Sequence, residues 1–296
     1  MNIAIVGHLY FAYKLAISLR DKGHNVTVFY HNAEWNNKSF QYYKMIKNVD
    51  MIYFFCAVGL RRYFRAFILR YIFRKKIVVH FVGSDSHKFL NYNMYKRFRW
   101  KSALNISHKV FGISPSIVQE LSPHINIELL PMSFEDFNSR FKPFPEKLTA
   151  LVYLPEKNPT FYGYDIINKL ARKNQNIHFI ILGYNKFPNC QNITLLPIDP
   201  EKDMNDLYYQ SSVLIRLTEH DGLSNMVMES LSRGRHVIWT TKFPYTHFCK
   251  RNINSIQKEL NIVKSKSDNR KAMRWVQQNF NQSKLMDNLE TIIKSL

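Results

Sequence analysis

Glycine is scarce in this sequence. Nine glycines occur among 296 residues, and no two of them lie close together. A dinucleotide-binding Gly-x-Gly-x-x-Gly turn and a phosphate-binding P-loop both need closely spaced glycines after a strand. The loop after the first expected strand instead runs from Gly7 to Ala12 with no second glycine. The sequence therefore argues against NAD chemistry and against P-loop ATP hydrolysis.

Cysteine is also scarce, with three residues far apart in the chain at Cys56, Cys190 and Cys249. An odd number of scattered cysteines predicts neither a disulfide framework nor a local metal site, and it favours a reducing compartment. The sequence has no Asp-x-Asp motif and no His/Cys cluster with metal-ligand spacing. We therefore expect no metal site and no bound cofactor.

Acidic residues are too few to balance the basic ones, because 22 Asp and Glu face 42 Lys and Arg, a net charge of +20. The surplus is concentrated in residues 1–147, which hold 22 basic and 9 acidic residues. Such a charge attracts anionic membrane surfaces, nucleic acid or phosphate-bearing substrates.

The sequence lacks an uncharged apolar run of membrane-spanning length, and Met1 to Gly7 read as a buried strand, not as a signal peptide. With the positive charge, this pattern predicts a cytoplasmic protein that lies peripherally on the inner face of the membrane.

Apolar segments with the composition of buried strands alternate with helical segments along the chain. The expected strands are residues 2–6, 26–30, 51–56, 77–82, 150–154, 177–182, 193–197, 213–217 and 236–240. This alternation predicts an α/β fold with parallel sheets. Residues 139–148 have two prolines and no apolar period, which is typical of a linker. We expect domains at residues 1–140 and 141–280, followed by a terminal helix at 281–296.

Two clusters mix basic and aromatic residues, at 60–76 and at 92–101. The apolar side chains of the first cluster are typical of a crossover helix packed on a sheet. The basic side chains of both clusters suit a lipid headgroup layer. Stacking of nucleobases on the aromatic rings is the alternative, although no nucleic-acid motif accompanies them.

Residues 213–240 read as a strand, an acidic loop, a short helix and a second strand. Asp221 precedes the helix, Glu229 lies inside it, and Gly234 stands where a left-handed residue ends a helix. Two carboxylates thus flank a helix N-terminus, whose N–H groups and dipole attract phosphate. The acids suit sugar hydroxyls and the amides suit a diphosphate. An ordinary βαβ unit with solvated acids is the alternative.

Residues 221–229, Asp-Gly-Leu-Ser-Asn-Met-Val-Met-Glu, resemble the acid-x7-acid signature of glycosyltransferase family 4, whose members have the GT-B fold. The resemblance implies two Rossmann-like, doubly wound parallel-sheet domains that face a central cleft, with the terminal helix crossing back to the first domain. It places Asp221 by the donor sugar as a catalytic residue and Glu229 at the nucleotide ribose. It places four residues near the diphosphate: Gly222, Leu223, Ser224 and Asn225. The first acid is usually Glu in the family, and the nearby Glu219 has the wrong spacing.

The segment from Ile77 to Asp85 resembles the family's strand, histidine and Gly-Ser/Thr-Asp turn that face the cleft. The resemblance implies catalytic or acceptor-side roles for His80 and Asp85. The alternatives are a half-buried histidine with satisfied hydrogen bonds and an aspartate that serves a turn or a helix N-cap.

Many family members hold the donor diphosphate with an Arg and a Lys in the loop after the first strand of the second domain. Lys157 lies in that loop, and Arg216, at the end of a strand, is the other candidate. A salt-bridged surface arginine is the alternative for Arg216. The resemblance also places Pro197 by the nucleotide base. The first loop lacks the family's Gly-Gly pair, which puts a phosphate role for Gly7 and His8 in doubt.

The resemblance implies a retaining, metal-independent transfer of a hexose from a nucleotide diphosphate sugar to a glycan or lipid-linked acceptor. The expected partners are the donor, the acceptor and an anionic membrane surface. Two other functions stay open. One is a basic α/β protein that binds nucleic acid, and the other is a GT-B-like interaction module that has lost catalysis.

Overall fold

The computed structural model describes residues 1–7, 9–30, 47–55, 66–132, 137–198 and 204–296. His8, Cys56 and residues 60–65 of the first basic cluster lie outside the described residues. The chain divides into two compact units: Met1–Glu135 with Gln282–Leu296 form unit 1, and Asp136–Asn281 form unit 2. The division between the units therefore falls just before the segment 139–148 that the sequence marks as a linker.

Unit 1 contains a six-stranded parallel sheet in the order β2-β1-β3-β4-β5-β6. The strands are β1 (Asn2–Gly7), β2 (Asn25–Tyr30), β3 (Met51–Phe55), β4 (Lys76–Phe81), β5 (Lys109–Gly112) and β6 (Glu128–Leu129). All five residues of β3 are buried, as expected for a strand covered on both faces. At the end of β1, Gly7 has a φ of +141°, and a Cβ there would lie 2.2 Å from the carbonyl oxygen of Phe55. Only glycine fits this junction between β1 and β3.

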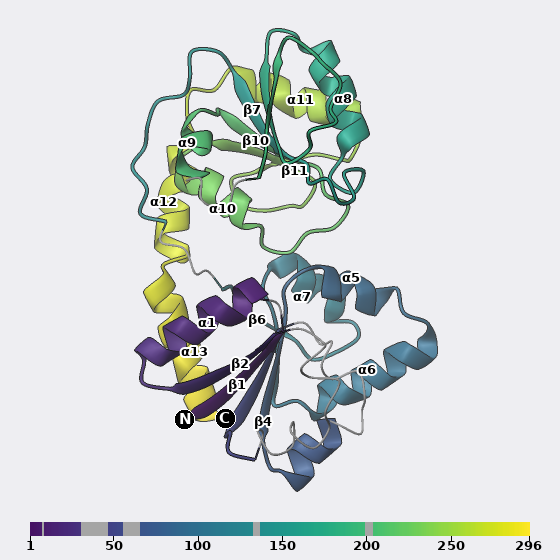
Figure 1. Cartoon of the computed structure of the whole chain (residues 1–296), viewed down its shortest axis with the longest axis vertical. Coiled ribbons are helices and arrows are strands. Elements are labelled where there is room, and N and C mark those ends of the chain that lie inside the picture. Colours follow the sequence, from purple (N-terminus) through teal and green to yellow (C-terminus); the bar gives the residue numbers. More distant parts are fainter. Residues whose placement is uncertain (8, 31–46, 56–65, 133–136, 199–203) are drawn as a thin grey trace. The chain divides into compact units, whose positions relative to one another are not determined.

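Helices cover both faces of the unit 1 sheet (Figure 1). They are α1 (Leu9–Asp21), α5 (Ser84–Leu90), α6 (Met94–Ile106), α7 (Pro115–Leu121) and α13 (Gln282–Ser295), with a π-helical turn, η2, at Ile68–Ile72. α1 contacts α13, while α5 contacts both α6 and α7. None of the helices in the described part of the chain is both long and apolar enough to cross a membrane.

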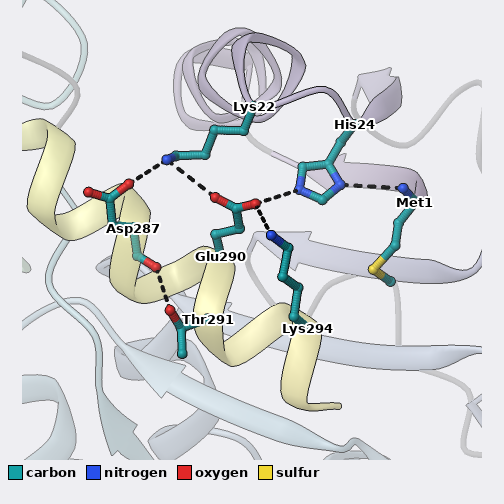
Figure 2. Close-up of polar contacts among 7 residues, drawn as sticks. All are labelled: Met1, Lys22, His24, Asp287, Glu290, Thr291 and Lys294. Atoms are coloured by element: carbon teal, nitrogen blue, oxygen red, sulfur yellow. Dashed lines mark hydrogen bonds and ion pairs between the residues drawn. The ribbon is translucent and has the colours of Figure 1, made fainter.

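Charged side chains attach the C-terminal helix α13 to the start of unit 1 (Figure 2). Lys22 donates to Asp287 at 2.5 Å and lies 3.3 Å from Glu290. Glu290 also accepts from Lys294 at 2.6 Å and lies 3.7 Å from the His24 ring. Glu290 therefore joins α13 to the end of α1 and to the turn that leads into β2.

Unit 2 contains a second six-stranded parallel sheet, in the order β12-β11-β10-β7-β8-β9. The strands are β7 (Thr149–Tyr153), β8 (His178–Leu182), β9 (Ile193–Leu196), β10 (Val213–Arg216), β11 (His236–Trp239) and β12 (His247–Phe248). The chain adds strands outward on one side of β7 and then returns to add strands outward from β10. In a doubly wound sheet, the point where this order reverses is where ligands bind.

Two helix pairs pack on unit 2. α8 (Tyr164–Lys173) contacts α11 (Ile253–Lys264), and α10 (Asn225–Ser232) contacts α12 (Arg270–Asn279); α9 (Met204–Tyr209) precedes β10. Gly234 follows α10 with a φ of +70°, which confirms the predicted left-handed residue. Each of the nine predicted strands is present in the structure, with bounds within one residue of those expected.

The predicted linker packs against unit 2 through a buried arginine. Arg235 precedes β11 and is fully buried, and its guanidinium donates to the carbonyl of Lys142 at 2.7 Å. The same group lies over the rings of Phe144, at 5.0 Å, and Tyr209, at 5.5 Å. Burial lowers the pKa of Arg235 to about 10, so the group stays charged at neutral pH. A cation held this way orders the chain just before β7.

Two buried histidines predict how stability depends on pH. Burial lowers the pKa of His236 to about 4, with His247 and Lys266 adding to the effect and Asp268 opposing it. Burial likewise lowers the pKa of His80 to about 3. In the unfolded chain both rings have the ordinary histidine pKa of about 6.5. Below that pH the unfolded state therefore binds protons that the folded state does not bind. The free energy of unfolding should therefore fall as the pH drops from about 6.5 towards 4.

The His236→Phe variant tests this prediction, because phenylalanine keeps the ring contacts with Phe144 and His247 but does not titrate. Urea unfolding between pH 6.5 and 4.5 should give a slope up to about 1.4 kcal/mol per pH unit shallower than in the wild type. Equal slopes for wild type and His236→Phe would contradict the prediction.

Candidate functional site

The candidate site lies at the carboxyl ends of β7 and β10, the neighbouring strands at which the order of the unit 2 sheet reverses. β7 ends at Tyr153 and β10 ends at Arg216. Arg216 lies over the ring of Tyr162, with its guanidinium carbon 5.9 Å from the ring centroid. Burial and then Tyr162 raise the pKa of Tyr153, while Arg216 lowers it. Two phenols and one guanidinium therefore come together here.

Arg216 and Asp221 form an ion pair at the centre of this site. The Arg216 Nε donates to the Asp221 carboxylate, and the two side chains are only 14% and 13% exposed. Burial opposes the charge of Arg216, but Asp221 outweighs it and holds the pKa of Arg216 above its ordinary value. Asp221 also accepts from the Thr218 hydroxyl at 3.2 Å and from the Gly222 N–H at 3.1 Å. The mostly buried carboxylate of Asp221 is therefore stabilised by a counter-charge and by two further hydrogen bonds.

Arg216 keeps further hydrogen-bonding capacity. Its Nε is engaged by Asp221, and no acceptor among the described residues takes a hydrogen bond from its two Nη groups. The N–H groups on its two Nη atoms can therefore still donate hydrogen bonds to phosphate oxygens.

The N-terminus of α10 follows the Asp221 loop directly. Leu223 and Ser224 are buried, and the Ser224 side chain makes no capping hydrogen bond to the helix. The first turn of a helix has backbone N–H groups without intrahelical acceptors, and its dipole is positive at this end. Gly222, Leu223, Ser224 and Asn225 therefore lie where the sequence places a phosphate-binding turn.

Glu229 lies further along α10 and is held by α9. The buried Tyr208 donates its hydroxyl hydrogen bond to the Glu229 carboxylate. Burial and the negative charge of Glu229 raise the pKa of Tyr208 well above its ordinary value, so the phenol stays protonated as a donor. Arg233 donates to the Glu229 backbone carbonyl at 2.8 Å and lies over the Tyr208 ring at 5.0 Å. The carboxylate is thus oriented before any ligand binds.

A cavity of about 380 Å³ opens at the carboxyl ends of the neighbouring strands. Its lining comes from the loop after β7, from the end of β8 and from the end of β9: Glu156, Gly183, Asn185, Leu195, Leu196, Pro197 and Ile198. This volume lies in the range of small-molecule pockets. The family resemblance implies that Pro197 lies by a nucleotide base, and in the structure Pro197 lies on this cavity wall.

Two other charged residues of these loops, Lys157 and Glu219, are much more exposed than Arg216. Lys157 is exposed in the loop after β7. Glu219 is 53% exposed and lies 3.3 Å from Arg251, which also donates to the backbone carbonyls of Leu217 and Thr160. Sequence reasoning missed Tyr208, Tyr162 and Arg251, because nothing in their local pattern separates them from other aromatic and basic residues.

The structure places His80 and Asp85 inside unit 1. His80 is fully buried, its Nδ1 lies 2.8 Å from the Tyr53 hydroxyl, and its ring stacks on Phe55 at 5.8 Å. Asp85 is also buried and accepts from the N–H groups of Val82, at 3.2 Å, and Gly83, at 2.8 Å. Both side chains are therefore enclosed by protein groups, and Asp85 stabilises the turn before α5.

Solved structures share this architecture over the whole chain. Sucrose-phosphate synthase from Thermosynechococcus elongatus superposes with a TM-score of 0.77 at 12% identity, covering 100% of this chain and 98% of that one. The chain has the GT-B fold. An alpha,alpha-trehalose-phosphate synthase (UDP-forming) from Burkholderia vietnamiensis superposes with a TM-score of 0.70 at 8% identity, covering both chains completely, 100% of each. The resemblance to GT-B glycosyltransferases and the predicted doubly wound sheets are confirmed at the level of the fold.

A third neighbour is TarM of S. aureus, solved with Fondaparinux, alpha-GlcNAc-glycerol and UDP. It superposes with a TM-score of 0.55 at 11% identity, over 81% of this chain and 55% of that one. No protein-family model matches the sequence, and no curated protein matches it by sequence comparison. The shared fold therefore comes with strongly divergent residues, and function has to be argued from the site itself.

The Arg216–Asp221 pair predicts a difference between two neighbouring acids. Replacing Asp221 by Asn leaves a mostly buried guanidinium without its counter-charge, and breaking such a pair costs about 3 kcal/mol. Glu219→Gln is the matched control, because Glu219 forms an exposed ion pair that contributes less than about 1 kcal/mol. Urea unfolding measures both changes. Adding Arg216→Met to Asp221→Asn should recover part of the loss, since the unpaired charge is then removed. Equal losses in Asp221→Asn and Glu219→Gln would contradict this account.

Proposed function

We propose that the protein is a glycosyltransferase that binds a nucleotide diphosphate sugar in unit 2. The observation that supports this proposal is the cluster at the switch point of the sheet. A mostly buried Arg216–Asp221 pair at the end of β10, the N-terminus of α10 and an oriented Glu229 occur in the same unit as a cavity of about 380 Å³ at the ends of β7, β8 and β9. Such a set contains a partner for each part of the donor.

The diphosphate is the leaving group, and its negative charge grows as the glycosidic bond breaks. Positive charge and oriented N–H dipoles stabilise such a transition state. In this proposal the Arg216 Nη groups, the loop at Gly222 and the amides of Leu223 to Asn225 surround the diphosphate. Arg216 is favoured over Lys157 because it is already held at the site by Asp221 and Tyr162, so less conformational freedom is lost on binding. The proposed reaction uses no metal ion.

The two carboxylates bind hydroxyl groups. Asp221 lies beside the proposed diphosphate position and accepts hydrogen bonds from the donor sugar, while Glu229, oriented by Tyr208, accepts from the ribose. His80 and Asp85 have no step in this proposal, since protein groups enclose both side chains.

The cavity beside Pro197 takes the nucleotide base. We favour uridine, because a UDP-forming enzyme and a UDP complex are among the structures with this fold. The proposed transfer moves a hexose with retention of configuration to a glycan or lipid-linked acceptor. The protein would act in the cytoplasm, peripherally on the inner face of the membrane.

Thermal stability measured with UDP, GDP, ADP and their sugar conjugates tests the donor site. A ligand that binds only the folded state increases the free energy of unfolding, by about 2.7 kcal/mol at a hundredfold excess over Kd, and therefore raises the melting temperature. We expect selective stabilisation by UDP and a UDP-sugar with a metal chelator present throughout. Glu229→Ala should abolish the shift, and Tyr208→Phe should reduce it, because the carboxylate loses its orienting donor.

Glu219→Ala is the matched control and should shift like the wild type, since that acid is exposed and paired with Arg251. If no nucleotide stabilises the wild type, or if Glu229→Ala responds fully, the donor site is wrong. Salt-sensitive RNA binding without any nucleotide response would favour the nucleic-acid alternative. UDP binding without transfer or hydrolysis of any donor would favour the inactive interaction module.

A further inference from the structure

Helix α6 of unit 1 is apolar on two opposite sides. Its inner side buries Trp100, Ala103 and Leu104, and the Trp100 ring lies 6.1 Å from Phe89 of α5. At 100° per residue, Met94, Tyr95 and Phe98 lie on the opposite side of the helix. They are 88%, 68% and 67% exposed. One apolar side therefore explains how α6 packs on unit 1, and the other has no role in that packing.

Basic residues flank this outer side of α6. Lys101 and Arg99 border it on either side of the helix, and Arg99 lies over the exposed ring of Tyr95 at 5.6 Å. Arg97 differs from them, because its guanidinium donates to the backbone carbonyl of Leu90. Lys96 and Arg99 also line a shallow cavity of about 200 Å³ with Tyr92 and Trp100. The cavity offers two cations and two aromatic walls, and Arg99 links it to the exposed ring of Tyr95.

The surrounding sequence is almost without negative charge. Between Asp50 and Glu120 the chain has thirteen Lys and Arg and one acid, Asp85. Asp85 is buried and is used by the turn at Gly83. The positive charge around α6 is therefore not neutralised by acids of its own stretch of sequence.

We propose that the outer face of α6, formed by Met94, Tyr95 and Phe98 with Arg99 and Lys101 at its borders, binds an anionic lipid surface, and that the adjoining cavity at Lys96 contributes to this binding. The three apolar side chains enter the boundary between headgroups and acyl chains, and the basic side chains contact the lipid phosphates. This is the behaviour of an interfacial helix, whose binding combines buried apolar area with attraction to anionic lipid. The cavity between Lys96 and Arg99 takes one phosphate-bearing headgroup.

Charge and shape favour a lipid surface over a nucleic acid. A single-stranded nucleic acid needs a basic groove with aromatic rings against which successive bases stack. Here the apolar side chains lie on the solvent-exposed side of a helix, and the most exposed of them, Met94, has no ring. A protruding apolar side between cations fits a soft, anionic layer.

This inference deepens the proposed function, since it names the surface on which a lipid-linked acceptor would be met. It does not depend on sugar transfer, because lipid binding is measured without donor. The two ideas can therefore fail separately.

Co-sedimentation of the full chain with phosphatidylcholine vesicles, with and without phosphatidylglycerol, tests the surface. The wild type should bind the anionic vesicles and bind the neutral ones weakly. The triple change Met94→Ser, Tyr95→Ser and Phe98→Ser should weaken binding at least about tenfold. Lys96→Gln with Arg99→Gln should remove most of the preference for anionic lipid. The control change, Phe248→Ser with Ile262→Ser, removes exposed apolar side chains of unit 2 and should leave vesicle affinity as in the wild type.

All variants should keep the melting temperature of the wild type and its response to UDP, so a loss of vesicle binding is not a loss of folding or of the donor site. Two results would overturn the proposal. One is vesicle binding that the triple change leaves intact, which would assign it to net charge alone. The other is absent vesicle binding together with tight single-stranded RNA binding that the triple change abolishes.

Discussion

The proposed chemistry of this protein depends on a single ion pair at the end of β10. Arg216 would be costly to bury alone at the switch point of the sheet, and Asp221 supplies its counter-charge. The pair orders the loop that leads into α10, because Asp221 also accepts from Thr218 and from the Gly222 amide. It thereby positions a guanidinium, a carboxylate and a helix N-terminus together. The same carboxylate that is proposed to bind a sugar also keeps the site folded, so its mutation has to be judged by stability as well as by activity.

Much of unit 2 was predictable from the sequence because its signals are local. The spacing of Asp221 and Glu229 around a helix start, and Gly234 at the helix end, define a strand–loop–helix–strand unit that the structure contains. Partners from distant segments were not predictable. Tyr208 holds Glu229 from a preceding helix, and Arg235 holds the segment before β7 across 93 positions. Such contacts follow from sheet order, which no local pattern encodes.

The histidine of β4 illustrates the same limit. The sequence placed His80 near a strand end and left open whether it is satisfied within the protein. The fold gives the ring Tyr53, Phe55 and Phe111 as neighbours and no exposed surface. Which side of a fully buried strand a residue faces depends on the helices that cover the sheet, and both sides of β4 are covered. The two units also differ in charge. In unit 2 Asp221 balances the positive charge of Arg216 at the candidate site, whereas in unit 1 the sequence around α6 has many more basic than acidic residues.

Amide hydrogen exchange of the full chain with and without UDP is the most direct test of the donor site, because it reports where the nucleotide binds. The account predicts protection of the amides from Leu223 to Asn225 and of the segment around Pro197, with little change in unit 1. Protection confined to unit 1, or no protection at α10, would contradict it.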